Sequence, residues 1–178
     1  MPLYRELGNP VTETLLDRYY ADRRRWAFTT QTHFLAERYR MIQSLAPDKT
    51  GIMDRSIFGD RIFAQMLAAE GFMDREEYLT YCAIFDAIVT FIPEPRLLIY
   101  LDCSVDTAMR RIRRRNRGLE PGIPREYLEN LNDRYLAWYH TYDQSPRLFV
   151  NTEEFRVDAP HELEPVIRQI GRVIRQYG

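Results

Sequence analysis

The chain has 178 residues, 45% of them hydrophobic, a size that suits one globular core rather than two. Its formal net charge of -1 excludes the global positive field of a nucleic-acid scaffold, and no apolar run approaches the roughly 20 residues of a membrane span. Cys82 and Cys103 lack metal-ligand or redox spacing and fit buried free thiols. We therefore expect a single cytoplasmic domain, residues 1–178, that binds neither nucleic acid nor membrane.

Strand and helix signals alternate along the chain. Strands are predicted at Met1–Leu7, Gly51–Met53, Leu97–Leu101 and Leu148–Val150. Hydrophobic spacing predicts helices at Val11–Tyr20, Arg23–Leu45, Asp60–Ala69, Arg75–Phe91, Val105–Arg115, Arg125–Tyr142 and His161–Gln176. This alternation predicts an α/β fold of three layers, α/β/α, around a parallel sheet.

Three local signals sharpen these elements. Asp22 is placed to cap the helix that starts at Arg23, and Pro124 is predicted as the first residue of the helix that follows it. The run Leu97–Leu101 shows no polar alternation. It is therefore predicted to be a parallel strand that is buried on both faces.

An arginine-rich stretch follows the helix predicted at 105–115. Arg110–Pro124 carries six arginines within eight positions and ends in a loop broken by glycine and proline. Guanidinium groups match phosphate oxygens and keep their charge, so the stretch suits a mobile clamp on a polyanion. A solvated helix face is the alternative. Residues 110–122 are called the arginine lid below.

Two smaller groups could carry chemistry. Asp54-Arg55-Ser56 follows a predicted strand, at the end where parallel sheets bind ligands, and suits either a metal–phosphate complex or an ion-paired turn. Gln31 and Arg38 share one helix face, where an amide could read the edge of a heterocycle or simply face solvent. Lys49, the only lysine, has no glycine-rich lead, so these residues contain no Walker A loop.

Four segments in this order resemble the deoxyribonucleoside kinase family, in particular its bacterial deoxyadenosine, deoxyguanosine and deoxycytidine kinases. They read Y-A-D-R-R-R-W-A-F-x-x-Q at Tyr20–Gln31, D-R-S-I-F-G-D at Asp54–Asp60, L-L-I-Y-L at Leu97–Leu101 and R-I-R-R-R-N-R-x-x-E-x-G-I-P-x-E-Y-L from Arg111 to Leu128. The resemblance implies a P-loop kinase fold. It also implies transfer of the ATP γ-phosphoryl, with Mg²⁺, to the 5′-hydroxyl of a deoxynucleoside in nucleotide salvage.

The resemblance also implies roles on the side of the nucleoside acceptor. Gln31 is similar to the amide that pairs with the base, and Arg38 and Asp60 to the pair that reads the rest of its edge. A carboxylate there accepts from an exocyclic amine, which favours adenine, guanine or cytosine over thymine. Tyr20 and Glu120 resemble the family residues that hold the 3′-hydroxyl of the nucleoside.

On the side of the triphosphate donor, Asp54 resembles the acid that helps to position Mg²⁺, and Arg55 the guanidinium beside the attacking hydroxyl. Three residues of this chain resemble the family's lid arginines, which neutralise the transferring phosphoryl: Arg111, Arg115 and Arg117. Glu154 and Phe155 resemble the family residues that border the adenine of ATP. Asn116 stands where the family's lid usually has glycine, but asparagine tolerates the left-handed backbone of a tight turn.

The beginning of the chain departs from the family pattern. The family starts with a strand, a Walker A loop and a helix, and this sequence begins after them. A missing central strand would leave apolar side chains exposed on both neighbouring strands, and the chain alone is expected to give little product. The catalytic base is expected at Glu6, while Asn9 could occupy that place but could not take the proton.

Two other functions were weighed against a deoxynucleoside kinase. One is a non-catalytic relative that binds nucleosides but has lost ATP chemistry. The other is phosphorylation of a nucleotide, as in thymidylate kinases, which the placement of Gln31 and Asp60 disfavours. Family members commonly form homodimers, and the aromatic-rich stretch Tyr78–Phe91 of a predicted helix could supply such a face.

Overall fold

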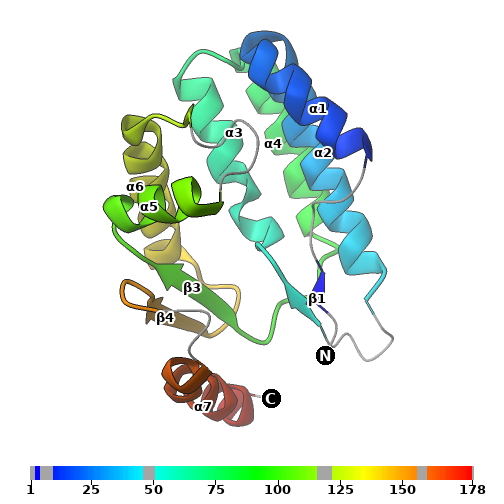
Figure 1. Ribbon diagram of the computed structural model, residues 1–178. Coiled ribbons are helices and arrows are strands. Elements are labelled where there is room, and N and C mark those ends of the chain that lie inside the picture. The colour runs from blue at the N-terminus through cyan, green and yellow to red at the C-terminus, as the bar shows by residue number, and fades with distance from the viewer. Residues whose placement is uncertain (1–2, 5–9, 46–50, 116–121, 156–159, 178) are drawn as a thin grey trace. The chain divides into compact units, whose positions relative to one another are not determined.

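The computed structural model describes residues 3–4, 10–45, 51–115, 122–155 and 160–177 (Figure 1). Contacts divide the chain into two compact units, Met1–Ile92 and Pro93–Gly178. The expectation of a single domain over residues 1–178 stays a prediction.

The first unit is mainly helical, with one pair of short strands. Its elements are β1 (Leu3–Tyr4), α1 (Pro10–Ala21), α2 (Arg23–Gln43), β2 (Ile52–Met53), the 3-10 helix η1 (Ile57–Gly59), α3 (Asp60–Ala69) and α4 (Arg75–Val89). Strands β1 and β2 are parallel, with Leu3 opposite Ile52 and Tyr4 opposite Met53. The predicted alternation of strand and helix is therefore confirmed here.

Polar caps explain where two of these helices begin. The Asp22 carboxylate accepts from the backbone N–H of Arg25 at 3.0 Å, as the sequence predicts. Asp74 and Glu77 cap α4 reciprocally, because each side chain accepts from the other's backbone N–H, at 2.8 and 2.9 Å.

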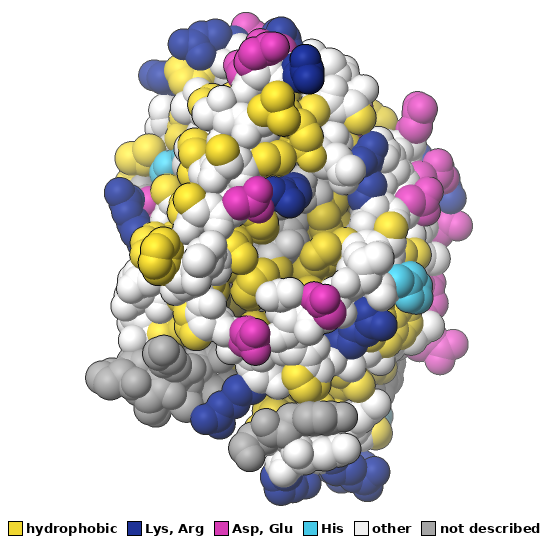
Figure 2. Space-filling model, turned by 180° about the vertical axis from the view of Figure 1, so that it is seen from behind, with side chains coloured by type: hydrophobic (Ala, Val, Ile, Leu, Met, Phe, Trp, Pro, Cys, Tyr) yellow, Lys and Arg dark blue, Asp and Glu magenta, His cyan; other side chains and the backbone are white. Residues whose placement is uncertain are grey.

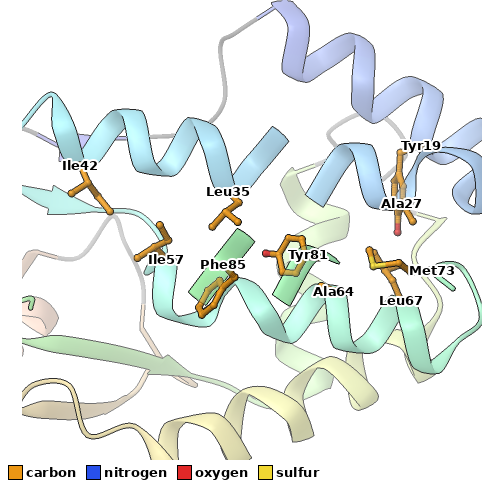
Figure 3. Packing of buried hydrophobic residues seen from close by; sticks show 10 residues of the cluster. All are labelled: Tyr19, Ala27, Leu35, Ile42, Ile57, Ala64, Leu67, Met73, Tyr81 and Phe85. Carbon is orange, nitrogen blue, oxygen red and sulfur yellow. The ribbon is translucent and has the colours of Figure 1, made fainter. Parts of the chain in front are cut away.

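The core of the first unit lies where α2, α3 and α4 pack against one another. Leu35 from α2, Ala64 from α3 and Tyr81 from α4 are fully buried there (Figure 3). Helix α1 packs on α2, and Trp26 and Phe28 contribute half-buried rings, as expected for core residues. This packing fixes the parts of α2 and α3 that carry Arg38 and Asp60.

The second unit contains the other parallel pair. Its elements are β3 (Leu98–Asp102), α5 (Val105–Arg115), α6 (Arg125–Thr141), β4 (Arg147–Asn151) and α7 (Pro160–Tyr177). Strand β3 pairs with β4 from Leu98 opposite Arg147 to Asp102 opposite Asn151. The Tyr139 ring of α6 packs on one face of this pair, 5.0 Å from the centroid of Tyr100 and 5.6 Å from that of Phe149.

The prediction that Leu97–Leu101 is buried on both faces is wrong. Ile99 is 36% exposed and Leu101 65%, while Leu98 and Tyr100, which alternate with them, are half-buried. The reason is that α6 covers the face that bears Tyr100, and no described residue buries Leu101 on the other face. Ile52 on β2 is also 51% exposed. Exposed apolar side chains thus occur on both β2 and β3; a further strand beside them stays a prediction.

Two other expectations need correction. Cys82 on α4 and Cys103, the residue after β3, are free but only half-buried, and neither belongs to the buried core. Pro124 is the N-cap of α6 and not its first residue: its ψ of 147° is extended, and the helix begins at Arg125.

The surface carries both signs of charge. Figure 2 shows acidic and basic side chains interspersed on the face it presents, in keeping with the near-zero net charge. Among the described residues, no helix combines the length and apolar character needed to cross a bilayer.

Candidate active site

Helices α2 and α3 bring Arg38 and Asp60 together. The guanidinium Nη1 of Arg38 contacts the carboxylate Oδ1 of Asp60, and the two residues are only 1% and 7% exposed. Charges are removed from water at high cost unless they are paired, so each residue makes the burial of the other tolerable. The sequence analysis assigns both to the edge of the base, and the structure brings them into direct contact.

The second carboxylate oxygen of Asp60 is also buried. Among the described residues this Oδ2 has no hydrogen-bond partner. A buried acceptor without a donor is unfavourable by about 1 to 3 kcal/mol, so such atoms usually mark a place where a ligand or water completes the hydrogen bonding. A carboxylate beside a guanidinium offers an acceptor next to donors, which suits an amine adjacent to a ring nitrogen.

Gln31 and Tyr20 lie on neighbouring helices of the same unit. Gln31 is half-buried on α2, two turns before Arg38, and a spacing of seven residues puts both side chains on one face of the helix. Tyr20, near the end of α1, is half-buried and packs edge-on against Tyr19 at 5.4 Å. Both residues lie on helices that the sequence predicts, and their roles in binding stay predictions.

Asp54 and Arg55 follow β2, and both side chains are exposed. Arg55 has a φ of 75°, in the left-handed region that is unfavourable for a residue with a side chain. Its guanidinium lies 4.9 Å from the centroid of the Phe63 ring on α3. Strained backbone of this kind is concentrated at functional sites. The observation therefore supports the assignment of Arg55 to the chemistry.

In the second unit, α5 carries the first half of the arginine lid. Arg111 donates from Nη1 to the Thr152 hydroxyl at 3.0 Å and from Nη2 to the Thr152 carbonyl. Arg115 is exposed at the end of the helix. Arg111 therefore contacts the segment after β4, the segment that the sequence analysis assigns to the adenine of ATP.

That segment holds Glu154, which is exposed, and Phe155, which is half-buried. A tight turn shapes it, because the Phe155 N–H donates to the Thr152 carbonyl at 3.0 Å. The remaining predicted site residues, Glu6, Arg117 and Glu120, lie outside the described residues.

Sequence reasoning missed two polar residues. Glu153 accepts hydrogen bonds from Ser104 and Thr107, 49 and 46 residues earlier, and no sequence pattern connects positions so far apart. The other is Tyr81, whose hydroxyl is buried without a hydrogen-bond partner among the described residues. Burial raises the pKa of Tyr81 above its ordinary value, against the smaller opposing effect of Arg38.

Comparison with known proteins decides the family. A model of the family described as deoxynucleoside kinase matches residues 3–175. The chain belongs to the deoxynucleoside kinase family. It is 34% identical to the deoxyadenosine/deoxycytidine kinase of Bacillus subtilis over 164 residues, covering 89% of this chain and 76% of that protein. It is 32% identical to the deoxyadenosine kinase of Dictyostelium discoideum over 170 residues, covering 94% and 68%.

Solved structures of deoxynucleoside kinases share this fold. Deoxyadenosine kinase from M. mycoides, solved with dCMP and dCDP bound, has a TM-score of 0.80 and 28% identity, covering 97% of this chain and 86% of that one. The same protein with bound dATP gives 0.76 and 27%, covering 95% and 86%. The fold is therefore the α/β fold of P-loop kinases, as predicted, and the protein is a phosphotransferase enzyme.

Proposed function

We propose that this enzyme transfers the γ-phosphoryl of ATP to the 5′-hydroxyl of a deoxynucleoside whose base carries an exocyclic amine. Its relatives in Bacillus subtilis and Dictyostelium discoideum are named for deoxyadenosine and deoxycytidine, and both of those bases carry such an amine. Capture of preformed deoxynucleosides would make the reaction a step of nucleotide salvage.

The observation that carries this proposal is the buried Asp60 carboxylate, which contacts Arg38 through Oδ1 and whose Oδ2 has no hydrogen-bond partner within the part of the chain that the structure describes. An exocyclic N–H of adenine, guanine or cytosine would donate to that oxygen, and the Gln31 amide would bond the same edge from one face of α2. Thymine presents a carbonyl oxygen where cytosine presents the amine. Two acceptors would then face each other, which disfavours thymidine.

Transfer requires the 5′-oxygen to attack the γ-phosphorus while the bond from that phosphorus to the leaving oxygen of ADP breaks. The proton of the hydroxyl passes to a carboxylate, for which Glu6 is our candidate, although it lies outside the described residues. Arg55 would stabilise charge on the attacking oxygen. Tyr20 and Glu120 would hold the 3′-hydroxyl.

The Mg²⁺ expected with ATP would be held partly by Asp54. The described residues contain no group of three or more His, Cys, Asp or Glu that could hold a metal. A single exposed carboxylate at the end of β2 nevertheless fits, because Mg²⁺ in kinases is bound through one or two carboxylates together with the substrate phosphates. When bound, it would neutralise charge on the phosphate oxygens.

On the donor side, Arg111, Arg115 and Arg117 would lie over the phosphates, and Glu154 and Phe155 would border the adenine. The exposed guanidinium of Arg115 at the end of α5 suits attraction of a polyanion from water. A homodimer and a cytoplasmic location stay predictions.

Phosphorylation of the four deoxynucleosides by the natural enzyme, with Mg·ATP, tests the proposal. Deoxyadenosine, deoxyguanosine or deoxycytidine should show a kcat/KM at least about a hundredfold above that of thymidine, because one unpaired buried acceptor is equivalent to a few kcal/mol. Equal or preferred phosphorylation of thymidine would contradict it.

A further inference from the structure

The carboxylate of Glu153 accepts hydrogen bonds from the first turn of α5. The Ser104 backbone N–H donates to Oε2 at 2.7 Å and the Ser104 hydroxyl donates to Oε1 at 2.9 Å, while the Thr107 hydroxyl donates to Oε1 as well. A negative charge at this end of a helix is favourable, because the N-terminal N–H groups lack partners within the helix. Glu153 thus attaches the segment after β4 to the start of α5.

A second attachment lies one turn further along the same helix face. Arg111 follows Thr107 by four residues and donates to both the hydroxyl and the carbonyl of Thr152. Thr152 is itself fixed to β3, because its N–H and its hydroxyl donate to the Asp102 carbonyl at 2.7 and 2.8 Å. The two attachments together prevent α5 from turning independently of residues 151–155.

Helix α5 ends in three exposed arginines, Arg113, Arg114 and Arg115. A helix is stiff over the eight residues from Thr107 to Arg114, so a small rotation at its start is carried to the guanidinium groups at its end. The Arg110 guanidinium lies 3.9 Å from the Glu153 carboxylate, so the two residues form an ion pair near the start of the helix. The orientation of the lid arginines therefore depends on the contacts of Glu153.

We propose that Glu153 is a positioning residue that couples binding of the donor's base beside Phe155 to the orientation of the lid arginines on α5. The inference rests on the proposed function, since it needs a nucleoside triphosphate donor. Glu153 would act on the reaction through α5, without itself binding the phosphates or the acceptor. A residue that only capped the helix would stabilise α5 but would leave the KM for ATP unchanged.

The test is steady-state kinetics of Glu153→Gln in the natural enzyme, with ATP and the preferred deoxynucleoside varied separately. An amide lacks the charge that favours these hydrogen bonds, so the KM for ATP should rise about tenfold and kcat should fall severalfold, while the KM for the nucleoside stays within about twofold. Glu164→Gln is the matched control, since that exposed carboxylate accepts from Arg168 at 3.0 Å on α7 and touches neither attachment. Its kinetic constants should equal those of the unsubstituted enzyme.

A second pair of variants separates positioning from folding. Thr107→Val keeps the shape and loses the hydroxyl, whereas Thr107→Ser keeps the hydroxyl; only the first should raise the KM for ATP. Hydrogen exchange of the α5 amides should slow when ATP is added to the unsubstituted protein and not when it is added to Glu153→Gln.

A lower melting temperature with an unchanged KM for ATP in Glu153→Gln, or equal values in the two Thr107 variants, would overturn the inference and leave the proposed function intact. Failure of the unsubstituted protein to phosphorylate any deoxynucleoside would overturn the proposed function, and this inference with it.

Discussion

The two units hold their charged candidate residues in opposite ways. In Met1–Ile92, Arg38 and Asp60 are buried against each other among packed helices. In Pro93–Gly178, the arginines at the end of α5 are exposed, and the helix is attached at its start through Glu153. A buried pair has its geometry fixed before a ligand binds, which suits discrimination between similar bases. Exposed guanidinium groups can adjust to a triphosphate, which is nearly the same for every donor.

The largest expected effect comes from removing one partner of the buried pair. Arg38→Ala leaves the Asp60 carboxylate buried without its counter-charge and should lower the free energy of unfolding by about 3 to 5 kcal/mol. Urea denaturation measures the change. The matched control is Asp86→Ala, which removes a partner from the exposed pair of Arg61 and Asp86, 2.6 Å apart. That change should stay below about 1 kcal/mol. Equal losses in the two variants would contradict the contrast between buried and exposed charge.

Arg55 should show a conflict between stability and activity. Arg55→Gly removes the side chain from a backbone with a φ of 75° and should stabilise the fold by about 1 kcal/mol. The same change should lower kcat about a hundredfold or more, because it removes the guanidinium that we propose stabilises the attacking oxygen. Arg55→Ala should lose the activity without the gain in stability. Full activity in either variant would remove Arg55 from the chemistry.

At Tyr81, removal of a buried hydroxyl should raise the stability of the protein rather than lower it. Tyr81→Phe removes an oxygen that has no partner among the described residues and keeps the ring, which stacks on Phe85 with centroids 6.5 Å apart. The variant should be more stable by about 1 kcal/mol, measured by thermal or urea unfolding. A loss of stability of similar size would contradict this prediction and show that the hydroxyl has a hydrogen-bond partner.

The smallest effect should appear in the pH dependence of the second unit. Hydrogen bonds from Thr107 and Ser104 lower the pKa of Glu153 from its ordinary 4.5 to about 2. A lowered pKa stabilises the folded protein above pH 4.5, and this contribution is lost as the pH falls from 4.5 to 2. Acid unfolding followed by circular dichroism should therefore separate the unsubstituted protein from Glu153→Gln above pH 4.5. The two should converge near pH 2; a constant difference throughout would contradict the assigned pKa.

Local chemistry made much of the fold predictable. Asp22 caps α2 as expected, and α3 and α5 begin and end at the predicted residues because hydrophobic spacing and flanking polar residues define them. Burial of β3 was predicted wrongly, since an unbroken apolar run says nothing about which neighbours will cover it. The predicted start of α6 at Pro124 was wrong by one position, because a proline with extended backbone also fits the position before a helix.

The candidate site was predictable only in part. The family pattern paired Arg38 with Asp60, and the structure adds that both are buried in direct contact, which no sequence rule provides. The family pattern could not reveal the contact of Glu153 with Thr107, because hydrogen bonds between distant segments depend on how strands and helices are assembled.

We propose that Asp60, oriented by Arg38, accepts a hydrogen bond from an exocyclic amine of the base. Isothermal titration calorimetry of the chain with deoxyadenosine, deoxycytidine and thymidine tests it most directly, since binding of the acceptor needs no donor. We predict that at least one of the two amine-bearing nucleosides binds about tenfold or more tightly than thymidine, and that Asp60→Asn abolishes this preference. Thymidine binding as tightly as both of the others, or a preference that survives in Asp60→Asn, would contradict the account.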